Sequence, residues 1–188
     1  MKKLIVLFIS ILCCLSVFTQ EEEIQTIFKK GTRISGFGGP FMDFTLINQE
    51  FAHMMGGGGG ILLGDFFFGG YGEGLTNYID VSENQIQFGH GGFWTGYSLF
   101  GHKSIHPCIS AQIGWGSIEQ IDNDYSYYEP DNVFVVNPTI ELEMNFLKWF
   151  RLSIGANYRL VTGVNTLDLT DNDMSAPGVF LAFKFGAF

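Results

Sequence analysis

The feature that most constrains this chain is a strict alternation of apolar residues with polar or small ones between positions 132 and 188. It covers residues 140–146 (IELEMNF), 152–160 (LSIGANYRL) and 179–187 (VFLAFKFGA). A period of two is typical of β-strands that have one apolar and one polar face. The sequence therefore predicts a sheet with a continuous apolar face. The signal-like N-terminus and the final Phe188 indicate that lipid covers that face.

Composition narrows the class of protein. Only 15% of the residues are charged, and the chain holds 25 Gly and 20 Phe, whereas soluble domains carry about 25% charged residues. The formal net charge of −9 argues against nucleic-acid binding, which requires a basic surface. Two of the three cysteines fall in the signal-like segment, which leaves Cys108 without an intrachain disulfide partner.

The N-terminus has the pattern of a secretory signal peptide, because Lys2 and Lys3 precede an apolar run over residues 4–18. Cleavage is expected between Thr19 and Gln20. The alternative is an uncleaved anchor helix, for which the run is a little short. No other apolar run approaches the length of a membrane helix, so a mature membrane protein has to be a closed barrel. We expect a signal peptide over 1–19, a periplasmic segment over 20–31 and a barrel over 32–188.

Eight strands are expected, at about 32–46, 52–64, 66–76, 85–100, 104–118, 133–147, 149–163 and 177–188. After the first strand, tight links at 64–65, 101–103 and 147–149 alternate with long, acidic ones at 77–84, 119–132 and 164–176. The link at 47–51 is a short exception. Short turns at one end and long loops at the other are typical of outer-membrane barrels. The predicted fold is all-β, an eight-stranded antiparallel up-and-down transmembrane β-barrel with both termini on the periplasmic side.

Three places interrupt the pattern. Pro40 cannot donate a ladder hydrogen bond, which suggests a bulge at Gly38–Gly39. Five consecutive glycines at 56–60 offer no side-chain pattern. His90 shares the parity of Ile86 and Phe88, which we assign to the lipid side, so a bulge within 89–92 is expected to turn it inward.

The polar parity collects nearly balanced charges, which we assign to the barrel interior: Arg33, Asp43, Glu141, Glu143, Arg151, Arg159 and Lys184, with Glu73 as a further candidate. A hairpin centred on Lys148 places Glu143 diagonal to Arg151, within reach of a long side chain. Eight strands enclose a space that side chains can fill, so paired charges predict a packed plug rather than a conduit. The alternative is the wet outer face of a soluble sheet.

From about Gly31 to Phe188 the chain resembles the small eight-stranded outer-membrane barrels of Gram-negative bacteria, of the OmpX and OmpA-barrel type. The stretches 35–41 (SGFGGPF) and 66–72 (FFFGGYG) resemble barrel proteins of Bacteroidetes-type bacteria. The resemblance implies an outer-membrane location, surrounding outer-membrane lipid and insertion by the barrel-assembly machinery. In that family the final Phe shares parity with lipid-facing residues. Here Phe188 shares it with Lys184, while Phe183 and Phe185 lie on the apolar side.

Sequence motifs for cofactors and metals lack the context that these groups need. The glycine runs are not followed by a Lys-Ser/Thr pair and a helix, as phosphate loops are. His102 and His106 span a tight turn without the further ligands of a zinc site. The acidic loops lack calcium-loop spacing. We expect no cofactor and no bound metal.

Aromatic residues suggest two surfaces. Tyr125, Tyr127 and Tyr128 lie among acidic residues in the longest loop, a composition typical of adaptable contact surfaces. The residues expected in girdles at the membrane–water interfaces are Trp94, Phe100, Trp115, Trp149 and Phe150.

These observations favour a structural or surface-interaction role, with the acidic, Tyr-bearing loops facing an extracellular ligand or envelope protein. One alternative is a narrow pore for small solutes. Another is a secreted, soluble lipocalin-like barrel, which keeps its apolar parity inside. A few barrels of the resembled family modify lipid A with Ser and His near the outer rim. Only His53 lies near such a rim here, without a Ser and an acid placed to complete a relay, so we expect no enzyme.

Overall fold

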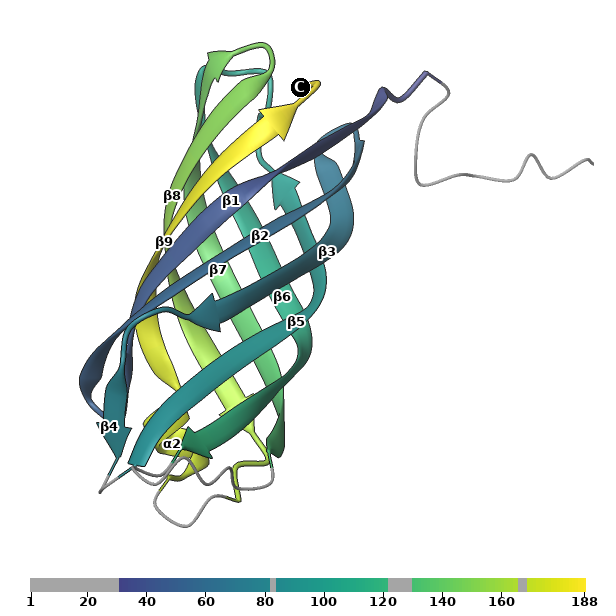
Figure 1. Cartoon of the computed structure of the whole chain (residues 1–188). Helices are drawn as coiled ribbons and strands as arrows, with labels where there is room; N and C mark the ends of the chain where they lie inside the picture. The colour runs from purple at the N-terminus through teal and green to yellow at the C-terminus, as the bar shows by residue number, and fades with distance from the viewer. Residues whose placement is uncertain (1–30, 82–83, 122–129, 166–168) are drawn as a thin grey trace, which may run out of the picture. The chain divides into compact units, whose positions relative to one another are not determined.

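The computed structural model describes residues 31–188 apart from 82–83, 122–129 and 166–168. These residues form a closed β-barrel (Figure 1). Its strands are β1 (Ile34–Ile47), β2 (Glu50–Leu63), β3 (Phe66–Leu75), β4 (Ile79–Val81), β5 (Asn84–Ser98), β6 (Ile105–Ile121), β7 (Asp131–Leu147), β8 (Phe150–Thr162) and β9 (Ala176–Gly186). A short helix, α2 (Asp171–Met174), precedes β9. Within the described ranges, no helix is long and apolar enough to cross a membrane.

All strand pairings are antiparallel. The order around the wall is β3-β2-β1-β9-β8-β7-β6-β5-β4, and pairing of β3 with β5 closes the barrel. β3 pairs with Gly89–Tyr97 of β5, and the three-residue β4 pairs with the preceding stretch Asn84–Ile86. β3 and β4 therefore occupy one position in the wall, which confirms the predicted eight-stranded up-and-down barrel.

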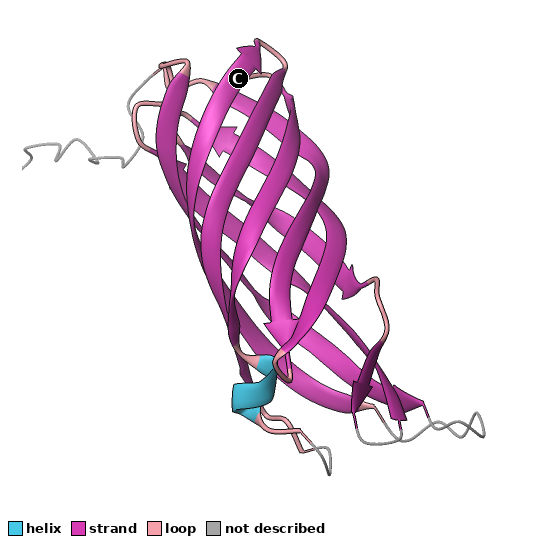
Figure 2. Ribbon diagram, turned by 90° about the vertical axis from the view of Figure 1, so that its left-hand side faces the viewer, coloured by secondary structure: helices cyan, strands magenta, loops and turns pink. Residues whose placement is uncertain are grey.

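The two ends of the barrel differ. At the tight-turn end, Gly64–Asp65, residues 99–104 and Lys148–Trp149 join consecutive strands. At the loop end lie the longer connections and α2, opposite the last residues of the chain (Figure 2). The turn between β1 and β2, at the loop end, is also tight, and its residues Asn48 and Gln49 both have positive φ (49° and 65°). Two positive φ values are typical of a type I′ hairpin turn, which matches strand twist.

Side chains alternate across the wall as the sequence predicts. In β7, Ile140 and Leu142 are 68% and 45% exposed, whereas Glu141 between them is 2% exposed. Large apolar residues face outward on the other long strands too, among them Phe51, Phe68, Phe93, Ile109, Ile154 and Val179. The apolar parity therefore covers the outside of the barrel and the polar parity its inside. This orientation is the reverse of the soluble ligand-binding barrel considered as an alternative.

Both predicted bulges are wrong. β1 pairs with β2 in unbroken register from Ile34↔Leu63 to Ile47↔Glu50, and Pro40 is accommodated because the pairing with β9 skips from Gly38 to Phe41. β5 likewise pairs with β6 without interruption. The register shift lies instead in β7, between Asn145 and Leu147. The predicted hairpin register there is confirmed, with Asn145 opposite Arg151 and Glu143 opposite Ser153.

The prediction of a lipid-facing girdle position for Trp94 is also wrong. Trp94 is 2% exposed and lies inside the barrel, with its ring centroid 5.6 Å from that of Phe41. Glycines provide the room, because a Cβ on Gly58 would lie 3.0 Å from the Trp94 ring. The run 56–60 is thus a regular part of β2 that leaves space for an interior ring. Trp115 and Trp149, by contrast, are exposed on the outer face.

His90, Ile86 and Phe88 all point inward. The assignment of this parity to the lipid side is wrong, because apolar residues also fill the interior near the loop end. His90 needs no bulge to reach the interior, since its parity already faces inward.

Candidate functional site

The barrel interior holds two layers of polar side chains, and an apolar cluster lies at the loop end. In the layer near the tight-turn end, the Lys184 ammonium on β9 bridges two carboxylates of β7. Its Nζ lies 2.9 Å from Glu141 Oε2 and 2.7 Å from Glu143 Oε1. Lys184 is 3% exposed, so both ion pairs are shielded from water and from salt.

The two carboxylates accept further hydrogen bonds from β5, β6 and β8. The Ser98 hydroxyl donates to Glu143 at 2.8 Å, and the His106 Nε2 lies 2.9 Å from the same carboxylate. The Ser110 hydroxyl donates to Glu141. The Ser153 hydroxyl of β8 donates to Glu143 at 3.3 Å. Together with Lys184, these contacts join five strands through two acids, as a buried charge requires if it is to be tolerated.

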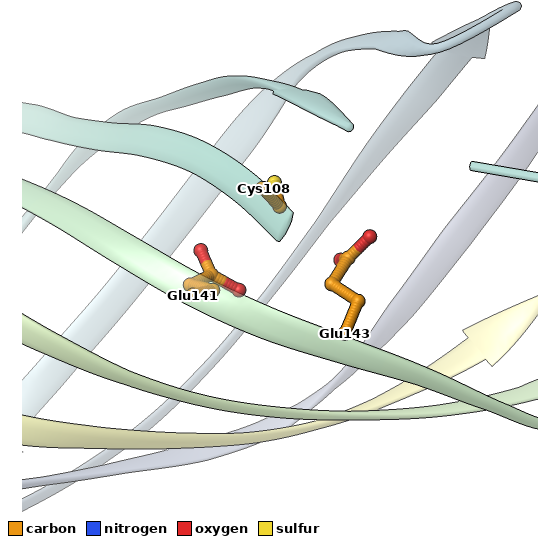
Figure 3. Close-up of side chains that lie close together, drawn as sticks. All are labelled: Cys108, Glu141 and Glu143. Carbon is orange, nitrogen blue, oxygen red and sulfur yellow. The ribbon is translucent and has the colours of Figure 1, made fainter. Parts of the chain in front are cut away.

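Cys108 lies beside the same carboxylates (Figure 3). The thiol and the oxygens of Glu141 and Glu143 lie within 4.8 Å of one another, which is close enough for a metal ion. The Lys184 ammonium already contacts both acids, and it also lies 5.1 Å from the centre of the Trp94 ring. A metal ion would therefore have to displace a buried cation. His102 is exposed and His106 is bound to Glu143, so these two residues do not converge on a common point.

The second polar layer lies nearer the middle of the barrel. Asp43 of β1 accepts hydrogen bonds from the amides of Asn157 (2.6 Å) and Asn137 (3.4 Å). Also in the interior, His90 Nε2 lies 3.1 Å from Glu73 Oε1, and its Nδ1 lies 3.0 Å from the Tyr71 hydroxyl. The sequence did not predict the contact between His90 and Glu73. The two residues lie on strands that follow each other closely along the chain, and this could have suggested the pair.

Arg159 lies apart from the other predicted interior charges. Its guanidinium donates to the carbonyls of Leu46 (2.8 Å) and Met174 (3.0 Å) and lies 3.0 Å from Met54 Sδ. It therefore ties β8 to β1 and to the end of α2. Arg33 lies at the rim and is exposed, and its Nη1 donates to the main-chain oxygen of Phe188 at 2.6 Å.

The seven predicted charges thus separate into groups. Glu141, Glu143, Arg151 and Lys184 are brought together, with Arg151 Nη1 3.5 Å from Glu143 Oε2. Asp43, Arg159 and Arg33 lie in three other places. Tyr125, Tyr127 and Tyr128 lie outside the described residues.

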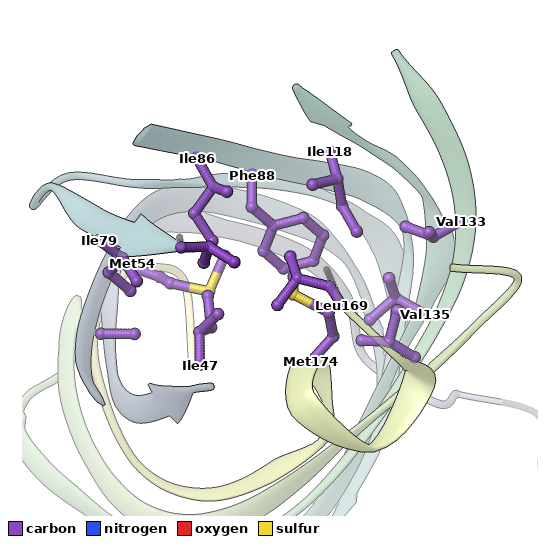
Figure 4. Close-up of a cluster of buried hydrophobic side chains, with 13 residues drawn as sticks. Ile47, Met54, Ile79, Ile86, Phe88, Ile118, Val133, Val135, Leu169 and Met174 are labelled. Atoms are coloured by element: carbon purple, nitrogen blue, oxygen red, sulfur yellow. The ribbon is translucent and has the colours of Figure 1, made fainter. Parts of the chain in front are cut away.

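The loop end of the interior is apolar (Figure 4). Thirteen buried side chains form one cluster there, from most of the strands and from the segment that contains α2: Ile47, Ala52, Met54, Ile79, Val81, Ile86, Phe88, Ile118, Val133, Val135, Val161, Leu169 and Met174. The last two, Leu169 and Met174, precede β9 and lie buried in the cluster. The sequence alternation assigned part of this cluster to the wrong side, because on β4 and β5 the apolar parity faces inward here, while Asp80, Gln85 and Gln87 of the polar parity are exposed.

Local hydrogen bonds hold α2 in that position. The Thr170 hydroxyl and main-chain amide donate to the Asp173 carboxylate at 2.6 and 2.9 Å. The main-chain N–H of Asn48 donates to the main-chain carbonyl of Asp173 at 2.7 Å. The bonds from the Thr170 side chain and backbone lower the pKa of Asp173 below its ordinary value. α2 is therefore fixed to the β1–β2 turn as well as to the interior cluster.

Charge is segregated along the barrel axis. Among the described residues, every exposed Lys and Arg lies at the tight-turn end: Arg33, Lys103 and Lys148. The charged side chains around the loop end are acidic, including Glu50, Asp80, Glu119 and Asp171, and Arg159 is buried there. The loop end is a negative surface and the opposite end a positive one.

No family model and no curated protein sequence matches the chain. Solved structures do match its fold. Neisserial surface protein A superposes with a TM-score of 0.61 at 11% identity, covering 83% of this chain and 99% of that one. Ail, the attachment invasion locus protein of Yersinia pestis, gives 0.53 at 10% identity, covering 82% and 98%. Ail in complex with the heparin analogue sucrose octasulfate also gives 0.53 at 10%, covering 81% and 97%. The chain therefore shares the fold of small eight-stranded outer-membrane barrels.

Proposed function

We propose that this chain is a non-enzymatic outer-membrane barrel with a sealed interior, which acts as a structural and surface-interaction element rather than a pore. The outward apolar side chains on every long strand support the membrane location. In this arrangement outer-membrane lipid surrounds the barrel, the barrel-assembly machinery inserts it, and the tight-turn end faces the periplasm.

The packed side chains of the interior favour a sealed barrel over a pore. At the loop end, thirteen apolar side chains pack together with Met174 among them, so an ion entering there would have to shed water in an apolar constriction. Farther in, the ammonium of Lys184 and the carboxylates of Glu141 and Glu143 bind one another. The two layers lie in series, so a solute would have to disrupt both.

Single-channel recording on the refolded protein in planar bilayers tests this choice. We expect conductance no higher than that of the lipid alone, with a general porin in the same bilayer as the positive control. Steady, reproducible conductance steps in the refolded protein would instead favour the narrow pore.

For the surface-interaction role, we propose that the acidic loop end, with Tyr125, Tyr127 and Tyr128, faces outward and binds a basic partner. One Ail structure contains a polysulfated heparin analogue. The negative loop end of this chain would repel such a ligand and attract positive charge. Binding of a lysine-rich peptide and of heparin to protein in vesicles, measured at low and high salt, tests this idea. We expect salt-sensitive peptide binding and no heparin binding, and the reverse preference would refute it.

A further inference from the structure

A pocket of about 730 Å³ opens at the tight-turn end of the barrel. Its charged lining comes from Arg33, Lys148, Arg151 and Asp65, with His102 beside them. Among the side chains of the lining, three permanent cations thus face one carboxylate. Because the exposed cations of the described chain all gather at this end, the local surplus of positive charge is not neutralised by the acidic residues of the loop end, which lie beyond the screening length at physiological salt.

Arg151 is largely buried but incompletely hydrogen-bonded. Its side chain is 9% exposed, yet its two polar contacts are long: 3.5 Å from Nη1 to Glu143 and 3.5 Å from Nη2 to the Gly101 carbonyl. Its Nε meets no hydrogen-bond acceptor among the described residues. Charge-assisted bonds to carboxylates or phosphates normally measure about 2.7–2.9 Å. Glu143 is already bound by Lys184 and His106, so the guanidinium keeps charge and donors for another anion.

The other cations add to this capacity. Lys148 is exposed in the turn between β7 and β8. Arg33 donates one hydrogen bond, from Nη1 to the Phe188 oxygen. An arginine has five N–H donors, so Arg33 keeps donors for an anion. The Phe188 ring lies 4.1 Å from the Arg151 guanidinium carbon, so the pocket has an aromatic wall behind its charged one.

Exposed apolar side chains continue from the pocket to the outer wall. Phe146 and Leu147 line it and are 59% and 51% exposed. Trp149, next in the turn, is also exposed and stacks on Phe185 with ring centroids 6.2 Å apart. A surface that joins cations to exposed apolar groups matches an amphiphile that carries negative charge at the end of an apolar body.

We propose that this pocket binds the phosphate headgroup of an anionic glycerophospholipid in the leaflet at the tight-turn end. The phosphate contacts Arg33, Lys148 and Arg151, and the acyl chains follow the apolar wall beside Phe146 and Leu147. The proposal rests on the proposed membrane location. It goes beyond that location because it assigns a specific lipid class to a specific pocket.

The test compares retention of phosphatidylglycerol and phosphatidylcholine by the full chain after extraction from mixed vesicles, measured by native mass spectrometry. The variants are Lys148→Gln and Arg33→Gln, singly and together. Lys103→Gln is the matched control, because Lys103 is exposed at the same end but does not line the pocket. Each variant is first folded in pure phosphatidylcholine vesicles. Failure of the wild-type chain to insert there counts against the membrane location and is thereby separated from the lipid preference.

We expect preferential retention of phosphatidylglycerol to fall about five-fold for each pocket cation removed and about thirty-fold for both, with Lys103→Gln unchanged. Two results would overturn the proposal. The wild-type chain could show no preference, or Lys103→Gln could lose it equally, which would indicate a diffuse charge effect.

Discussion

Replacement of Lys184 by Met should destabilise the barrel strongly while nearly preserving side-chain volume. The substitution removes the ammonium that lies 2.9 Å from Glu141 and 2.7 Å from Glu143, at a site that is 3% exposed. Glu141 then keeps only the Ser110 hydroxyl among the contacts described above, and Glu143 keeps Arg151 at 3.5 Å together with Ser98 and His106. Removing one partner of a buried ion pair costs about 3–5 kcal/mol. We expect a loss of about 4 kcal/mol in the free energy of unfolding.

Urea titration of protein folded in phosphatidylcholine vesicles, read by tryptophan fluorescence, measures this loss. Adding Glu141→Gln to Lys184→Met should recover part of it, because the amide removes one uncompensated buried charge. The matched control is Lys148→Met, an exposed lysine whose loss should change stability by less than about 0.5 kcal/mol. An unfolding free energy for Lys184→Met equal to that of Lys148→Met would refute the reasoning that Lys184 balances the interior carboxylates.

Three further predictions concern the outer wall, the apolar cluster and α2. Ile154 faces outward in the middle of β8. Ile154→Arg should therefore lower the free energy of unfolding in vesicles by about 2–4 kcal/mol, and Ile154→Leu by less than about 1.5 kcal/mol. Equal urea midpoints for the two variants would contradict this. Met174→Ala should lower stability by about 2–5 kcal/mol, since Met174 is fully buried, and an unchanged midpoint would show that α2 does not close the mouth. Because the folded-state pKa of Asp173 is lowered from 3.8, its contribution is fully present above pH 3.8 and is lost as pH falls through the lower folded value. Hydrogen exchange at residues 170–175 should therefore show lower protection, relative to the β-strands, on acidification below pH 3.8, and Asp173→Asn should abolish that dependence.

The fold was accessible from sequence because period-two alternation is a local signal that survives in each of β7, β8 and β9. The even count of strands predicted that the first and last strands begin and end at the tight-turn end, and the structure confirms this. Register depends on which residues meet across strands, so the sequence could not show that the wall tolerates Pro40 without a bulge. Nor could it show that the glycines of β2 make room for Trp94, because that contact joins strands far apart in the chain.

The interior was only partly accessible for a related reason. Parity alone separated inward from outward residues where polar side chains marked one face, as in Glu141 and Glu143. It failed at Ile86 and Phe88, where the interior itself is apolar. Which charges meet depends on barrel tilt and strand neighbours. Alternation therefore selected Asp43 and Arg159 as interior candidates but could not show that Arg159 binds carbonyls near α2.

Labelling from the lipid side tests most directly whether acyl chains cover the apolar parity. The folded protein in vesicles of lipids with photoreactive acyl chains is irradiated, and the labelled residues are mapped by mass spectrometry. We predict labels at Ile140, Leu142 and Ile154 and none at Glu141, Glu143 or Ser153, which alternate with them along β7 and β8. Labels on Glu141, Glu143 or Ser153 would contradict the membrane-embedded barrel. A folded chain that stays unlabelled in the aqueous phase would contradict it too.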